Sequence, residues 1–129
     1  MIEEISVRAG STREATEGTR RRSRWWLIAK NENGRAEFLT MDRDGGETLA
    51  VFGHEEEAEM FLHLGGYIDD GWRARESSPG EIVSVLYGPC SCAGGVALDP
   101  LPGMVDDGTL GLVRLRRERF LGRLLGHPQ

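Results

Sequence analysis

The sequence predicts an α+β fold, an antiparallel or mixed twisted sheet of about five to six strands with about three helices packed against it. Short apolar runs of strand character are separated by turn signals, and three segments change to helical spacing. The segments do not follow the regular strand–helix–strand alternation of a doubly wound fold. We therefore expect the helices to lie on one face of the sheet.

The first three predicted strands form a meander over residues 24–52. Trp25 opens a continuous apolar run that ends at Ala29, which is typical of a central strand covered on both faces. A turn signal at 31–34 precedes two further strands, at 36–41 and 48–52. Shorter strands are predicted at 72–76, 96–98 and 111–115.

Three helices are predicted from spacing and from end signals. Residues 54–64 place carboxylates in a first turn and end at a Gly-Gly pair. Ser78-Pro79-Gly80-Glu81 has the pattern of a capping box with proline at the first helical position, and predicts a helix that ends at Gly88-Pro89. At the C-terminus, helical spacing relates four apolar residues: Phe120, Leu121, Leu124 and Leu125.

The length of 129 residues suits one domain, and a hydrophobic share of 39% with a charged share of 29% is typical of a globular chain. We expect that domain to span residues 24–129. Residues 1–23 are rich in Arg, Glu, Ser, Thr and Gly, and we predict a flexible N-terminal tail there.

Charge is unevenly distributed along the chain. The formal net charge of −5 divides into +3 for residues 1–30, −12 for residues 31–113 and +4 for residues 114–129. An acidic average gives no general attraction to nucleic acid or to anionic membranes. No apolar run approaches the roughly 20 residues of a membrane span, so we expect no membrane association.

Cys90 and Cys92 are the two thiols of the chain, and they lie in one predicted loop. Two cysteines so close in sequence do not staple a secreted fold, which favours a reducing, cytoplasmic location. A structural zinc site needs four ligands, and His54, His63 and His127 lack finger or ribbon spacing. We interpret the thiols as structural and expect no metal and no cofactor; a thiol redox or metal site is the alternative.

Other chemical motifs favour turns over catalysis. Asp42-Arg43-Asp44-Gly45 has the opening of a calcium loop but lacks its later ligands, so a hairpin turn is the interpretation. The sequence contains no nucleophile elbow, phosphate-binding glycine loop or dinucleotide fingerprint. We therefore expect no enzyme and no catalytic residue.

Two groups of residues could form an interaction surface. Large aromatic side chains in strands are usually core, and an exposed one would mark a binding face; these are Trp25, Trp26 and Trp72. Arginines near the C-terminus could form a basic patch together with those at 20–24; the candidates are Arg116, Arg117 and Arg123.

The stretch from Phe38 to Asp42 and the stretch from Leu49 to Ala58, with the later Val96-Ala97-Leu98-Asp99-Pro100, carry a resemblance over about half of the chain. The chain resembles the SseB N-terminal-like family of small bacterial proteins in a strand that ends in Val-Phe, an acidic helix start and a later strand that ends in Asp-Pro. The resemblance implies an α+β fold and a non-catalytic accessory or interaction role. It transfers no catalytic residue.

These observations favour a non-enzymatic, intracellular bacterial accessory protein that acts through a protein-binding surface, with a protein partner or a second copy in a homodimer. Nucleic-acid or polyanion binding by the arginine-rich ends is the first alternative, which the net charge disfavours. Thiol or metal chemistry at Cys90 and Cys92 is the second.

Overall fold

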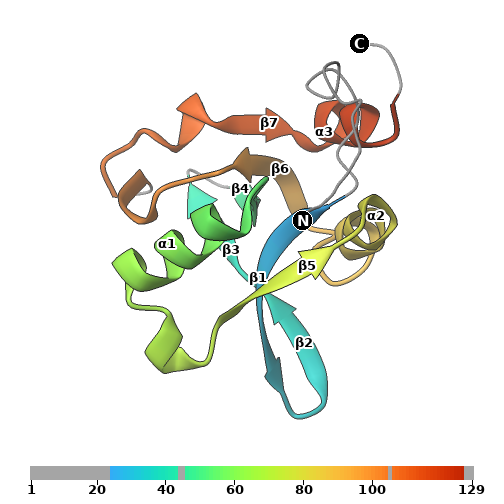
Figure 1. The fold of residues 1–129 in the computed structure, drawn as a ribbon. Helices are drawn as coiled ribbons and strands as arrows, with labels where there is room; N and C mark the ends of the chain where they lie inside the picture. Colours follow the sequence, from blue (N-terminus) through green and yellow to red (C-terminus); the bar gives the residue numbers. More distant parts are fainter. Residues whose placement is uncertain (1–23, 44–45, 105, 127–129) are drawn as a thin grey trace, which may run out of the picture.

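The structure is a computed structural model that describes residues 24–43, 46–104 and 106–126. Within these ranges the chain forms seven strands, three α-helices and three short 3-10 helices (Figure 1). The α+β class is confirmed. The strands and α-helices are β1 (Trp25–Glu32), β2 (Arg35–Phe38), β3 (Thr40–Arg43), β4 (Gly46–Val51), α1 (Glu55–Gly65), β5 (Arg73–Ser77), α2 (Pro79–Tyr87), β6 (Ala93–Leu98), β7 (Arg114–Arg116) and α3 (Arg117–Leu124).

The seven strands form two sheets. The sequence predicts a single sheet of about five to six strands, so this expectation is corrected. The first sheet has the order β2-β1-β5 and is antiparallel throughout. The second has the order β3-β4-β6-β7, in which β4 and β6 are parallel and the outer pairs are antiparallel. The second sheet is therefore mixed.

Leu39 is the point at which the predicted strand 36–41 divides between the sheets. Its N–H donates to Ile28 O at 2.8 Å, whereas its carbonyl oxygen accepts from Ala50 N at 3.4 Å. Reciprocal bonds of 2.8 Å between the backbones of Trp26 and Phe52 join β1 to the end of β4. The predicted three-stranded meander is thus corrected to two hairpins, one in each sheet.

The turn signal before β2 is confirmed. Asn33 and Gly34 connect β1 to β2 with φ angles of 53° and 78°. Two positive φ angles in a two-residue hairpin loop define the turn that matches the twist of the strands, and glycine adopts the second without strain. The hairpin turn predicted at Asp42-Arg43-Asp44-Gly45 also joins antiparallel strands, but Asp42 and Arg43 belong to β3. Residues 44–45 lie outside the described residues.

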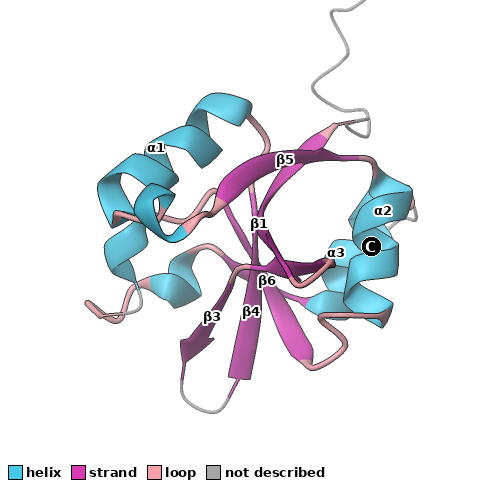
Figure 2. Cartoon of the chain, turned by 90° about the horizontal axis from the view of Figure 1, so that it is seen from below, coloured by secondary structure: helices cyan, strands magenta, loops and turns pink. Residues whose placement is uncertain are grey.

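The central strands are buried on both faces, and the helices cover both. Neighbouring residues of a strand point to opposite faces: Leu27 lies in the core under α2 and α3, and Ile28 lies in the core under α1. Leu49 and Ala50 divide in the same way. Figure 2 shows α1 on one side of the strands and α2 with α3 on the other. The expectation of helices on one face was therefore wrong.

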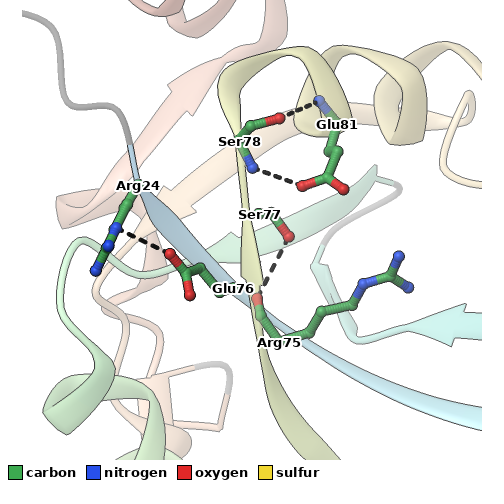
Figure 3. A network of polar contacts seen from close by, with 6 residues as sticks. All are labelled: Arg24, Arg75, Glu76, Ser77, Ser78 and Glu81. Carbon is green, nitrogen blue, oxygen red and sulfur yellow. Dashed lines mark hydrogen bonds and ion pairs between the residues drawn. The ribbon is translucent and has the colours of Figure 1, made fainter.

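The signals for the first two helices are confirmed. In α1, Ala58, Phe61 and Leu62 are buried, and Gly66 ends the helix at a φ of 72°. At the start of α2 the capping box is complete: Glu81 N–H donates to Ser78 Oγ at 3.2 Å, and Ser78 N–H donates to Glu81 Oε1 at 2.7 Å (Figure 3).

The C-terminal elements differ in their bounds from the expectation. The predicted strand 111–115 starts later, at Arg114, because Leu110–Leu112 form a 3-10 turn that buries Leu110 completely. Helix α3 ends before Leu125, whose side chain is 47% exposed, so three rather than four of the predicted apolar residues face the core. The predicted tail, residues 1–23, lies outside the described residues.

Among the helices of the described part of the chain, none has the length and apolar character needed to cross a membrane.

Candidate functional site

Two adjoining cavities form a groove beside β2. They have volumes of about 490 and 540 Å³ and share Ala36, Phe38 and Pro89 as lining residues. Each volume lies within the roughly 300–1,000 Å³ that is usual for a binding pocket. We call the pair of cavities the β2 groove.

The first cavity of the β2 groove has an apolar wall. It lies between the first sheet and α2, where Phe38 and Ala36 face Val85 of α2 and Pro89 beyond it. The Arg75 guanidinium lies 5.6 Å from the centre of the Phe38 ring. Ser77 also lines this cavity, and its hydroxyl donates to Arg75 O at 3.3 Å (Figure 3).

The second cavity is polar and carries an excess of negative charge. Three carboxylates line it together with one guanidinium: Glu32, Glu37 and Glu47 with Arg35. Such a set produces a negative potential in a hollow whose protein walls screen less than water does.

The backbone at the outer edge of β2 faces the groove. Hydrogen-bonded and non-hydrogen-bonded pairs alternate along an antiparallel ladder. Leu39 N–H bonds to Ile28 on β1, and Phe38 and Ala36 lie one and three positions before Leu39. The N–H and C=O groups of Phe38 and Ala36 therefore point away from β1.

The same alternation continues into β3, on the other side of the bend. Because Leu39 O accepts from Ala50 of β4, the backbone groups of Thr40 point to the outside of the second sheet. Thr40 also lines the polar cavity. The outward edges of β2 and β3 thus form one continuous edge along the groove.

The two predicted thiol residues have different environments. Cys90 is 5% exposed, and its N–H donates to Val85 O at 2.8 Å, so it lies just beyond the C-terminus of α2 as expected. Burial, and then the charge of Glu47, raise the pKa of the Cys90 thiol to about 11. Cys92 is exposed, and both cysteines are free thiols. Cys90 is therefore a poor nucleophile at neutral pH.

The structure gives no metal centre in the residues that it describes, where no three His, Cys, Asp or Glu side chains cluster at ligating distance. His54 and His63 are exposed at α1, on the face of the strands opposite to the core that contains Cys90. His127 lies outside the described residues.

The three tryptophans are half-buried and do not share one face. Trp25 packs on the core under α2 and α3, with its ring 5.6 Å from that of Phe120 in an edge-on arrangement. Trp26 and Trp72 pack on the core under α1, and Lys30 Nζ lies 4.8 Å above the Trp72 ring. All three tryptophans therefore belong chiefly to the two hydrophobic cores.

The predicted arginines lie in two different environments. Arg117 donates from Nη1 to Ser91 O at 3.0 Å and to Leu86 O at 3.5 Å, which places its charge at the C-terminal end of α2. Arg116 and Arg123 are exposed, on β7 and α3. The arginines at 20–22 lie outside the described residues. Arg117 is thus a structural residue, and the other two remain available to a partner.

Sequence reasoning missed the β2 groove. The turn at Asn33-Gly34 marks the hairpin, but nothing in the sequence indicates that α2 lies across a cavity from β2. Comparison of the chain with profiles of known protein families gave no match, and a search of curated proteins gave no significant match.

Proposed function

We propose that this chain is a non-enzymatic accessory protein that binds a partner protein in the β2 groove. The observation that carries the proposal is the combination, in one open groove, of an apolar wall, an excess of carboxylates over guanidinium groups and a strand edge with outward backbone groups. Recognition of protein segments commonly combines these three features.

The groove's own side chains favour binding over catalysis. Three of its potential nucleophiles are occupied or unreactive: Ser78 caps α2, Ser77 donates to a backbone carbonyl, and the Cys90 pKa is raised. No histidine is among the residues that line the two cavities. The described walls therefore lack the serine–histidine or cysteine–histidine pair that is common in acyl transfer.

We also propose an intracellular, bacterial origin and a relationship to the SseB N-terminal-like family. The free thiols of Cys90 and Cys92 agree with a reducing compartment. The family resemblance agrees with the α+β fold and with an accessory role.

A photoreactive benzoylphenylalanine introduced at Ser84 tests the proposal in cells of the source organism. Ser84 is exposed and lines the apolar cavity, so a bound partner should be crosslinked to it as one discrete product. The control places the same probe at Leu112, which is 81% exposed, in a turn whose neighbouring residues Leu110 and Val113 pack on the core under α1. Equal crosslinking at both positions, or none at either, would contradict the proposal.

Polyanion binding by Arg116, Arg119 and Arg123, all exposed, is the second candidate. We expect binding to duplex and single-stranded oligonucleotides no tighter than micromolar at physiological salt, because the chain is acidic overall. A salt titration checks this, since phosphate contacts make affinity fall steeply with salt. Submicromolar affinity with such a slope, lost on replacing these arginines with serine, would favour the polyanion role over ours.

A further inference from the structure

We infer that the occupant of the β2 groove is an extended, positively charged peptide segment of a partner protein, which adds as a strand to the outer edge of β2. The inference rests on the proposed function and specifies its mode and chemistry. Three independent features support it: the direction of the backbone groups, the charge of the walls and the contrast with the opposite edge of the structure.

Backbone direction defines the mode of binding. The N–H and C=O groups of Ala36, Phe38 and Thr40 point outward along one edge, and all three residues line the polar cavity. An added strand satisfies such groups with ladder hydrogen bonds, and alternate side chains then enter pockets on one face. Here the apolar cavity lies on that face, between Phe38 and Val85.

Wall charge defines the peptide. In the polar cavity, a strand along β2 passes Glu37 and Glu47, with Glu32 near the hairpin end, against one guanidinium at Arg35. The apolar cavity adds one charge of each sign, Glu81 and Arg75, so the groove as a whole keeps a negative excess. Lysine or arginine side chains of the peptide would pair with these carboxylates. We therefore expect a segment in which an apolar, β-branched or aromatic residue for the cavity alternates with basic residues.

The opposite edge of the structure, β7, shows how this chain protects a strand edge. Leu98 N–H donates to Val113 O, so the backbone groups of Val113 point toward β6. Because this direction alternates along an antiparallel strand, the backbone groups of Arg114 and Arg116 point outward. Long charged side chains and a length of three residues discourage strand addition. In β2, by contrast, the charged residues Arg35 and Glu37 alternate with uncharged ones, and the outward backbone groups belong to the uncharged Ala36 and Phe38.

Charge also argues against a second copy as the occupant. Antiparallel pairing of β2 with β2 of another copy, centred on Glu37, would place the Glu37 carboxylates of the two chains opposite each other, and like charges across a strand pair destabilise it. A basic segment of a different protein reverses the sign of this interaction.

The test uses the full chain and a library of random twelve-residue peptides displayed on phage. We expect selected peptides to alternate apolar and basic residues and to bind with a single site in a titration. Selection of acidic or of non-alternating peptides at this site would overturn the inference.

Backbone N-methylation of a selected peptide then reports the binding mode on the unaltered protein. Methylation of the amides that face β2 should weaken binding about tenfold for each bond lost, whereas methylation of the alternate amides should leave it unchanged. On the protein side, Ala36→Pro removes an outward N–H without removing a bond to β1, and it should also weaken binding about tenfold. Equal sensitivity of both sets of amides would overturn strand addition while leaving a partner in the groove, as the Ser84 crosslink reports separately.

Charge is tested by Glu37→Gln and Glu47→Gln, which together should weaken binding several-fold at low salt. Glu118→Gln on α3 is the matched control, because Glu118 is exposed and does not line the groove. Sedimentation of the chain, alone and with peptide, measures whether the chain forms a dimer and whether the peptide changes this. A dimer that the peptide dissociates would assign the edge to a second copy and overturn the inference.

Discussion

The two faces of the central strands are covered by different kinds of packing. On the α1 side, Phe52 meets Phe61 edge-on at a ring separation of 5.4 Å, and Phe61 stacks on Tyr67 at 5.3 Å. Leu110 is completely buried in the same core. On the other side, α2 and α3 bury the larger core, but α2 stands away from β2 and leaves the groove. The second face thus combines packing with a groove.

The largest expected effect concerns α3, which closes the second face. Replacing Leu121 and Leu124 with alanine removes two buried side chains, and each such change costs about 2–5 kcal/mol. Replacing Arg117 and Arg123 with serine should cost several-fold less, because the exposed Arg123 contributes about 0–1 kcal/mol and the half-buried Arg117 loses hydrogen bonds but no packed core side chain. Urea unfolding of the two double variants checks this. Comparable losses would mean that charge, and not packing, holds α3 in place.

The next-largest expected effect is a difference in stability cost between a substitution on the α1 face and one at the groove. Phe61→Ala opens the aromatic stack under α1 and should cost about 3–5 kcal/mol, because Phe61 is 1% exposed. Phe38→Ala should cost clearly less than Phe61→Ala, because Phe38 is half-buried at the wall of the groove. Thermal unfolding followed by circular dichroism gives both values. Equal costs would show that the groove wall is as much a part of the core as the α1 side.

A smaller effect is expected at the start of α2. Ser78→Ala removes the side-chain acceptor of the capping box and should cost about 1 kcal/mol, whereas Ser78→Gly should cost a few tenths. The measurement is the free energy of unfolding in urea. A neutral Ser78→Ala would indicate that packing of α2 alone determines where the helix begins.

The smallest effect is the pH response of the groove thiol. The folded pKa of Cys90, about 11, is higher than its ordinary value of 9.0, so folding favours the protonated thiol. The stability from this difference is complete below the ordinary value and is lost as the pH rises toward 11.

Cys90→Ala should therefore flatten the fall in stability between pH 9 and 11 that the unaltered chain shows. Below that range, at pH 8, Cys92 should react with a thiol reagent much faster than Cys90, because it is exposed. Fast labelling of both thiols in the folded chain would contradict the burial of Cys90.

Local signals in the sequence predicted local structure well. The capping box at Ser78, the helical spacing of Ala58, Phe61 and Leu62, and the turn at Asn33-Gly34 all depend on residues within one turn of each other. The division at Leu39 was not predictable in this way, because no glycine or proline marks it. It arises from hydrogen bonds to Ile28 and Ala50, which are remote in sequence.

The apolar segment from Leu49 to Phe52 indicates more than the single strand predicted there. An uninterrupted apolar run indicates a strand covered on both faces, and β4 is such a strand. The groove, by contrast, depends on the position of α2 relative to β2, which is set by packing across the whole domain. No short pattern of residues encodes that distance.

The parallel pairing of β4 with β6 has a consequence for how the chain folds. All of α1, β5 and α2 lie between these two strands in sequence, so the loop that closes when they meet is long. Closing a long loop costs entropy before the contacts form, and folds with many such non-local contacts reach the native state slowly. The two hairpins should form first, and the pairing of β4 with β6 should limit the rate.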